Sequence, residues 1–228
     1  SPTARTGRQP PPGGRRLPQG GRTKPASLVQ AQLMLARGCG HDAPQLTAHF
    51  GTRVRALRRE GDYWQAAAAD GSAIATAPVV VLANAGSAKL FADIAQPLQR
   101  ARGQLTHLPA HVGPRLRAVL TGNGYLLPAI DGIAVAGASY DIQGEDTTLR
   151  AADHAANLAQ LSALLGTDFS GVDAVMLAGS VGFRCVAPDR MPLAGALPDL
   201  AQVRARGADL IGAHAQDLPR LTGLYGAF

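Results

Sequence analysis

The segment with the strongest bearing on the fold is a continuous apolar run, Pro78–Ala83, which leads into Asn84-Ala85-Gly86-Ser87. A strand that is apolar on both faces is typical of a parallel sheet covered by helices. The small residues after it let the backbone turn sharply and approach a dinucleotide closely. Many parallel strands end in a Gly-containing turn for steric reasons alone. By itself the segment therefore predicts a parallel α/β piece and leaves the cofactor open.

The elements around this run form a recognisable order. A helix is predicted from Pro25, which suits a first helical turn, to Gly38, which suits a stop. Asp70-Gly71 is the strongest hairpin signal in the chain. The strands predicted before the apolar run are Thr52–Arg59, Tyr63–Ala69 and Ser72–Ala77, and a helix-like segment follows it from Ala88 to about Ala95.

The second half has a different pattern, with short strands and one clear amphipathic helix. That helix is predicted at Leu149–Leu165, with Leu158, Leu161 and Leu165 on one stripe, His154 on the polar side and Gly166 as its end. Asp199–Arg220 has weak periodicity and is predicted to be a loop, with a strand starting at Gly223. The other predicted strands are Gln104–Leu108, Gly124–Pro128, Ile133–Ser139 and Ala174–Val181.

This order predicts the α/β (α+β) fold class, with a mainly antiparallel substrate-domain sheet inserted into a doubly wound cofactor domain. We expect a basic Pro/Gly/Arg-rich tail at 1–24 and cofactor-domain segments at 25–100 and 182–228. The substrate domain is predicted at 101–181.

Composition and charge limit the classes of protein to which the chain can belong. The chain has 228 residues and a net charge of +6, but six basic residues and no acidic one lie in 1–24, so the body is formally neutral. A basic tail can hold a polyanion non-specifically, although a solvated arm is the commoner case. No stretch approaches the roughly 20 apolar residues of a membrane helix. Cys39 and Cys185 are far apart, and we interpret them as free thiols in a reducing cytoplasm.

Arg184 is the most informative candidate side chain. It follows Phe183 in an apolar strand, so its surroundings are predicted to be dry, and a guanidinium there needs an anionic partner. That partner is either a substrate carboxylate gripped by the bidentate fork or a structural carboxylate such as Asp189. Tyr125 could help hold a carboxylate, although an ordinary sheet tyrosine is more common.

Other chemistries find less support. His107 and His111 are four residues apart, but Pro109 between them makes a helix and thus a metal site improbable. No serine or cysteine nucleophile stands in a Gly-x-Ser-x-Gly context. Gly13-Gly14 and Gly20-Gly21 have no strand before them and are not a dinucleotide fingerprint.

Taken together, these segments resemble a known family. The most specific stretches are Arg102-Gly103-Gln104, Gly137–Asp141, Leu149–His154 and Val181–Cys185. The chain is similar to the D-amino-acid-oxidase-like superfamily of FAD-dependent oxidoreductases. Within it, the chain most resembles the C-terminal domain of the bifunctional tRNA 5-methylaminomethyl-2-thiouridine biosynthesis proteins, over about residues 18–226.

The resemblance implies FAD as cofactor and a carboxymethylamino group on the tRNA wobble uridine as substrate. Val54 would meet the adenine end of FAD, and Ala83-Asn84-Ala85-Gly86 would form the second cofactor-contacting turn. Arg184 and Tyr125 would hold the substrate carboxylate, with Arg184 also beside the flavin. A fused methyltransferase domain is expected in the full-length proteins, and nothing in this sequence matches it. A glycine or sarcosine oxidase, or an inactive truncated remnant, is the alternative.

The family begins with a strand, a Gly-x-Gly-x-x-Gly turn and a helix that receive the FAD pyrophosphate. This sequence has no counterpart of that Rossmann unit, and residues 1–17 match nothing in the family. We therefore expect a truncated chain that binds FAD weakly or not at all by itself. Stoichiometric flavin absorbance in the purified chain would contradict this expectation.

Overall fold

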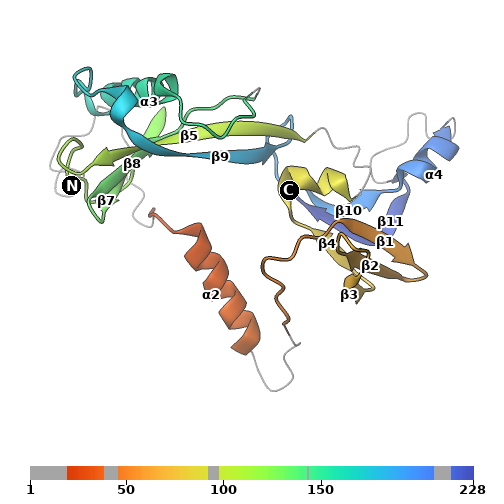
Figure 1. The fold of residues 1–228 in the computed structure, drawn as a ribbon. Coiled ribbons are helices and arrows are strands. Elements are labelled where there is room, and N and C mark those ends of the chain that lie inside the picture. The colour runs from red at the N-terminus through yellow and green to blue at the C-terminus, as the bar shows by residue number, and fades with distance from the viewer. Residues whose placement is uncertain (1–19, 39–45, 92–97, 143, 208–216) are drawn as a thin grey trace. The chain divides into compact units, whose positions relative to one another are not determined.

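The computed structural model describes residues 20–38, 46–91, 98–142, 144–207 and 217–228. The chain divides into two compact units. Unit 1 comprises residues 1–47 and 102–183, and unit 2 comprises residues 48–101 and 184–228. Figure 1 gives the element labels used below. The assignment of unit 1 to the substrate and of unit 2 to the cofactor remains a prediction.

Unit 2 contains two three-stranded sheets. Strands β1 (Ala56–Glu60), β2 (Tyr63–Ala67) and β3 (Ala73–Ala77) form an antiparallel meander. In the other sheet, β11 (Arg220–Ala227) pairs antiparallel with β10 (Ala194–Pro198) and parallel with β4 (Val80–Leu82). The parallel pairing predicted for the apolar run is therefore confirmed. The core of this unit consists of Trp64, Leu82, Ala88, Leu197 and Leu224.

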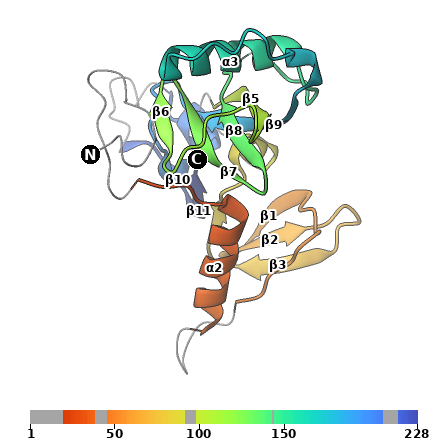
Figure 2. The same ribbon diagram turned by 90° about the vertical axis from the view of Figure 1, so that its left-hand side faces the viewer.

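Unit 1 is built on a five-stranded sheet in the order β6-β7-β8-β5-β9. Helix α3 (Ala151–Leu165) covers one face of this sheet, as Figure 2 shows. Leu158 and Leu161 of α3 are buried against the sheet, and Gly166 ends the helix in a left-handed conformation with φ 60°. The strands are β6 (Leu120–Gly122), β7 (Gly124–Ile130), β8 (Ile133–Gly137), β5 (Gln99–Pro109) and β9 (Ala178–Val186).

Alternation decides which side chains face α3. Leu108, Leu126, Ala134 and Ala136 are buried in the core beneath the helix. Their neighbours along each strand point to the opposite face, which we call the open face. Tyr125 is next to Leu126 and is half-buried on that open face. The amphipathic stripe predicted for α3 thus also fixes the side of the sheet on which Tyr125 lies.

Several sequence expectations were wrong at their edges. Residues 52–55 precede β1 instead of forming its first half, and Ala85–Leu90 is a 3-10 helix where a helix was predicted from Ala88. Ala174–Met176 is also a 3-10 turn, so β9 starts only at Ala178. The predicted loop after Asp199 contains helix α4 (Leu200–Ala205), because the Asp199 carboxylate caps it by accepting from Gln202 N.

Helix α2 (Pro25–Gly38) forms where predicted and buries none of its residues. Its apolar side chains Leu28, Val29 and Leu35 are exposed among the described residues. No helix in the described part of the chain has both the length and the apolar character needed to cross a bilayer.

Candidate functional site

The carboxyl end of β4 opens into a hollow of about 630 Å³ in unit 2, which we call the β4 hollow. Val54, Ala83 and Asn84 line it together, although Val54 is about thirty residues away in sequence. Ligands of open α/β sheets bind outside the carboxyl ends of the strands. The tertiary structure therefore brings three of the predicted cofactor residues to one place of the expected kind.

The other two residues of that turn are placed differently. Ala85 and Gly86 begin the 3-10 helix that follows, and neither lines the hollow. Ala85 has φ 51°, a conformation that costs a non-glycine residue energy and that is concentrated at functional turns. Val54 lies in the extended segment before β1, and not in the strand itself as predicted.

The β4 hollow suits part of FAD. Its volume is within the range of about 300–1,000 Å³ typical of ligand pockets. Its walls include the apolar side chains of Leu57, Val80 and Leu82, while the exposed Arg53 and Arg55 flank Val54 at the rim. Apolar walls can bind an aromatic base, and guanidinium groups can donate hydrogen bonds to phosphate oxygens. The residues present thus fit the adenosine end of the cofactor.

Arg184 lines a second, smaller hollow of unit 2, of about 270 Å³, which we call the Arg184 hollow. Cys185, a free thiol, and Phe228 are also in its walls. Arg184 is exposed, so the prediction of a dry environment was wrong. The reason is alternation along β9, which places Phe183 and Cys185 at half-buried positions and Arg184 outward.

The structural partner considered for Arg184 does not hold it. Among the described residues no ion pair joins Arg184 to Asp189. The Asp189 carboxylate instead accepts a hydrogen bond from Met191 N at 3.0 Å and shapes the local turn. Arg184 therefore presents a guanidinium to a small hollow, which is what recognition of a carboxylate needs.

Tyr125 belongs to unit 1, on β7. Its ring lies over Gly137 of β8, since a methyl group on Gly137 would come within 3.1 Å of the Tyr125 hydroxyl. His107 and Ser180 also lie in this unit, with 3.4 Å between Nε2 and Oγ. Because Tyr125 and Arg184 are in different units, their joint action on one carboxylate remains a prediction.

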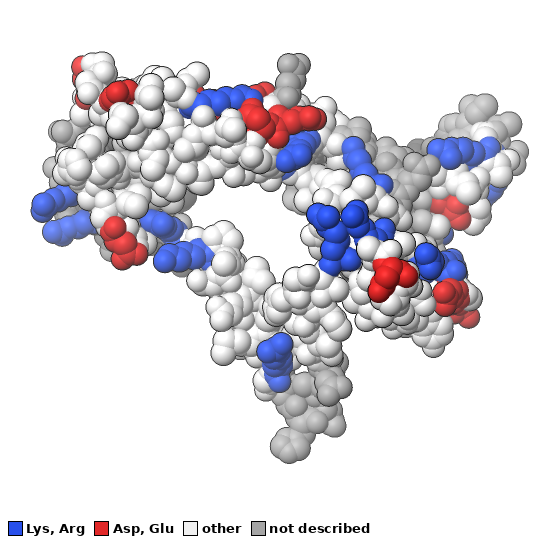
Figure 3. Space-filling view, viewed as in Figure 1, with Lys and Arg blue, Asp and Glu red and all other residues white. Residues whose placement is uncertain are grey.

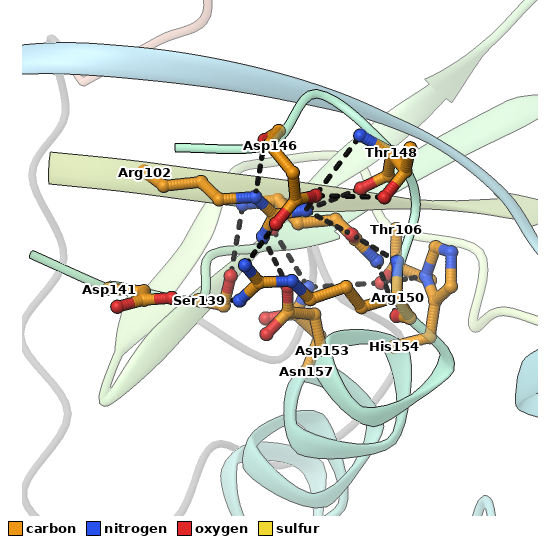
Figure 4. A network of polar contacts seen from close by, with 11 residues as sticks. Arg102, Thr106, Ser139, Asp141, Asp146, Thr148, Arg150, Asp153, His154 and Asn157 are labelled. Carbon is orange, nitrogen blue, oxygen red and sulfur yellow. Dashed lines mark hydrogen bonds and ion pairs between the residues drawn. The ribbon is translucent and has the colours of Figure 1, made fainter. Parts of the chain in front are cut away.

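A buried polar network fixes one side of unit 1 (Figure 4). Arg102 has no exposed surface, and its Nη1 is 2.5 Å from Asp153 Oδ2. Its other nitrogens donate to the carbonyl oxygens of Asp146 and Thr148 at 2.9 and 2.5 Å. Arg150 continues the network by pairing with Asp141 and Asp146. These bonds pin the segment between β8 and α3 onto β5.

The Arg150 hydrogen bond and that of Thr148 lower the pKa of Asp146 to about 2. Asp146 is therefore ionised throughout the neutral range. The network is saturated with carboxylates and backbone carbonyls, so we assign it to structure and not to chemistry.

The prediction that His154 lies on the polar side of α3 was wrong. His154 is buried on the sheet side of α3, with 2% of its surface exposed. Asn157 Nδ2 donates to Gln104 O and to Thr106 Oγ1, both at 3.0 Å. The Thr106 hydroxyl is also hydrogen-bonded to His154 Nδ1 at 2.8 Å. Burial lowers the pKa of His154.

No cluster of metal-ligating side chains occurs within the described ranges.

Known proteins share the sequence pattern and the fold of this chain. The family model of FAD dependent oxidoreductases (DAO) matches residues 2–221, which is nearly the whole chain. The expectation that residues 1–17 match nothing in the family was therefore wrong. The chain belongs to this family of FAD-dependent oxidoreductases.

A similar curated relative is the tRNA 5-methylaminomethyl-2-thiouridine biosynthesis bifunctional protein MnmC of Burkholderia thailandensis. It is 45% identical over 220 residues, which are 95% of this chain and 33% of the relative. The chain therefore spans about a third of the length of the curated relatives it matches.

Solved structures of FAD-family oxidases share the fold. Glycine oxidase from Geobacillus kaustophilus matches with a TM-score of 0.54 and 18% identity, over 77% of this chain and 42% of that one. Iminodiacetate oxidase from Chelativorans sp. BNC1 matches with a TM-score of 0.53 and 18% identity over the same shares. At this identity the match supports the architecture and nothing finer.

Sequence reasoning overlooked Arg53, Arg55 and Ser87 as walls of the β4 hollow. A signal for the two arginines was present, because they flank Val54 in an alternating stretch. Ser87 had no such signal, since only the turn into the 3-10 helix brings it back to the hollow.

Proposed function

We propose that this FAD-dependent oxidoreductase chain acts on the wobble uridine of tRNA and removes the carboxymethyl group from 5-carboxymethylaminomethyl-2-thiouridine, leaving the aminomethyl form. The observation that carries the proposal is the 45% identity, over 95% of the chain, to a protein named for that modification. The full-length protein would carry a fused methyltransferase domain that methylates the amine. A cytoplasmic location, where tRNA is modified, is part of the same proposal.

The two hollows of unit 2 supply the contacts that this reaction requires. In the β4 hollow, the backbone at Val54 and the Ala83–Gly86 turn would hold the adenosine end of FAD, with Arg53 and Arg55 at the rim. In the Arg184 hollow, the guanidinium would bind the substrate carboxylate as a bidentate pair. Tyr125 is proposed as the second carboxylate contact.

The chemistry is a two-electron oxidation of a secondary amine. FAD, when bound, supplies the acceptor for the hydride that leaves the carboxymethyl carbon. The nitrogen lone pair forms a C=N bond, water adds to that carbon, and glyoxylate departs while the amine stays on the tRNA. Arg184 contributes by fixing the carboxylate and hence the orientation of the C–H bond, and such positioning supplies most of the catalysis.

A direct test supplies the chain with FAD and tRNA carrying the carboxymethylaminomethyl nucleoside, followed by mass spectrometry of the digested nucleosides. Conversion to the aminomethyl nucleoside, with one glyoxylate formed per turnover, is the expected result. The Arg184→Leu variant should lose carboxylate recognition. Because Arg184 is also predicted to lie beside the flavin, the FAD affinity of this variant is measured separately from its conversion of the tRNA. The matched Arg58→Leu variant changes an exposed arginine of β1 and should behave like the unchanged chain.

The related alternative is an amine oxidase for glycine or sarcosine. Glycine and sarcosine in the same assay decide between the two, because oxidation of the free amino acids without conversion of the tRNA would replace the proposal. An inactive remnant would convert none of the three substrates, although the Arg184 hollow would remain.

A further inference from the structure

A third hollow, in unit 1, lies between the loop after β5 and the hairpin that joins β7 to β8. Its volume is about 510 Å³, and His111, Pro114, Arg115 and Gly132 are among its walls. We call it the loop hollow. All of its walls belong to unit 1, and none of them contributes to the β4 or Arg184 hollows.

Backbone hydrogen bonds hold the walls of the loop hollow in place. Ala110 N donates to Gly132 O at 2.8 Å, which ties the loop to the hairpin. Val112 N donates to Pro109 O at 2.9 Å, so the loop turns tightly where it leaves β5. Leu116 packs against the core beneath. A hollow built this way is preformed, which lowers the ordering cost of binding a ligand.

The charge around the loop hollow is mainly positive. Residues 104–130 contain Arg115 and Arg117 and no Asp or Glu. Both arginines are exposed, and neither forms an ion pair with a carboxylate within the described ranges. Arg22 adds a third guanidinium, since its Nη1 donates to Pro128 O of β7 at 3.1 Å. The hairpin also carries an acidic residue, Asp131, next to the lining residue Gly132.

Arg115 and Arg117 differ from Arg102 and Arg150 of the same unit in their charge partners. Arg102 and Arg150 are neutralised by Asp141, Asp146 and Asp153. Three carboxylates of the unit are thus engaged in the network, and no ion pair within the described ranges joins a carboxylate to Arg115 or Arg117. Figure 3 shows Lys and Arg side chains grouped at the end of unit 1 that carries the β7–β8 hairpin, with a smaller acidic group beside them.

We propose that the loop hollow binds backbone phosphates of the tRNA substrate. The inference rests on the proposed function for the identity of the polyanion, while the site itself rests on Arg115 and His111 in the walls of the hollow. The exposed Arg117 follows two residues further along the same loop. Guanidinium groups match phosphate oxygens in a bidentate geometry, and an imidazole can donate to a further oxygen. Such contacts fix the position of the RNA without reading its sequence.

The experiment measures binding of fluorescently labelled tRNA by anisotropy, using the full 228-residue chain across a series of salt concentrations. In the Arg115→Gln/Arg117→Gln variant, affinity at low salt should fall roughly tenfold, and the salt slope should become shallower by about one per arginine removed. The charge-preserving Arg115→Lys/Arg117→Lys variant should keep most of the slope. Inorganic phosphate in the millimolar range is a competitor that distinguishes a small-anion site from an RNA site.

The matched control is Arg37→Gln/Arg58→Gln, which removes the same charge from exposed positions of α2 and β1. All variants keep the basic tail, so its non-specific contribution cancels in the comparison. Equal salt slopes for the two double variants, or a chain with no salt-dependent tRNA binding, would overturn the proposal. Loss of inorganic phosphate binding in the Arg115→Gln/Arg117→Gln variant, with its tRNA binding unchanged, would assign the hollow to a small anion instead.

Failure of this inference and failure of the proposed function are distinguishable. Conversion of the modified nucleoside together with unchanged tRNA affinity in the variant removes only the loop hollow. Loss of tRNA affinity in the variant, with oxidation of glycine alone, leaves the phosphate site and removes the proposed substrate.

Discussion

Replacing Arg102 with methionine should destabilise unit 1 more than any other arginine substitution in its polar network. Methionine retains much of the length of the side chain and removes the guanidinium. Four bonds are lost, to the Asp153 carboxylate, to the carbonyl oxygens of Asp146 and Thr148, and to Gln104 Oε1. Since Arg102 is fully buried, water replaces these contacts poorly.

The magnitude follows from what the substitution leaves behind. Removing one partner of a buried ion pair typically costs about 3–5 kcal/mol, because the other charge stays uncompensated. The Asp153 side chain is 16% exposed and can recover some hydration, so the lower end, about 3 kcal/mol, is expected. With a urea dependence of about 1–3 kcal/mol per molar, the unfolding midpoint should fall by roughly 1–3 M.

The assay is urea unfolding followed by far-ultraviolet circular dichroism, which reports helix α3, and by tryptophan fluorescence. The chain has a single tryptophan, Trp64, and it lies in the core of unit 2. Fluorescence therefore reports unit 2 alone, whereas circular dichroism reports both units and includes the two longest described helices, α2 and α3, of unit 1. The circular dichroism midpoint should fall in Arg102→Met, with the slope unchanged.

Arg150→Met is the matched control, because it belongs to the same network and its side chain is 34% exposed. Water can replace its lost contacts to Asp141 and Asp146, so its effect should be small. A midpoint for Arg102→Met that coincides with that of Arg150→Met would refute the reasoning, since burial would then not decide the cost.

Three further predictions follow from the same contacts. Hydrogen bonds depress the pKa of Asp146 to about 2. Its contribution to the free energy of unfolding is therefore complete above the ordinary value near 3.8 and is lost as the pH falls toward 2. Acid unfolding of Asp146→Asn should lack this loss of stability. His154 has a lowered pKa because it is buried, so the unfolded chain takes up its proton first and stability should begin to fall below about pH 6.5. A proton NMR titration of its imidazole in the folded chain should show a midpoint below that value, and a midpoint above it would contradict the burial argument. Gly179→Ala should destabilise unit 1 by roughly 1–3 kcal/mol, because the added methyl would meet the Leu105 carbonyl oxygen and lie 2.7 Å from His154 Cε1. Gly182→Ala, three strand positions further with nothing within 4 Å of the added methyl, should be nearly neutral in the same urea unfolding assay.

Much of the local structure could be predicted because its causes are local. The Asp70-Gly71 turn, the stripe of α3 and its end at Gly166 all depend on neighbouring residues, and they form where the sequence places them. Helix α4 was missed because one cap, Asp199, starts it despite weak periodicity. The error at Arg184 arose because neighbouring apolar residues indicate a buried strand without indicating which face is open.

The sequence by itself determined the family, the order of elements and the residue types that FAD and a carboxylate require, since these depend on motifs and periodicity. Only the tertiary structure decided that Val54 meets Ala83 and Asn84 at one hollow, and that His154 is buried instead of exposed. It also decided which of the described arginines pair with carboxylates. The physical reason is that such pairings join residues far apart in the chain, and no local pattern of side chains encodes their distance.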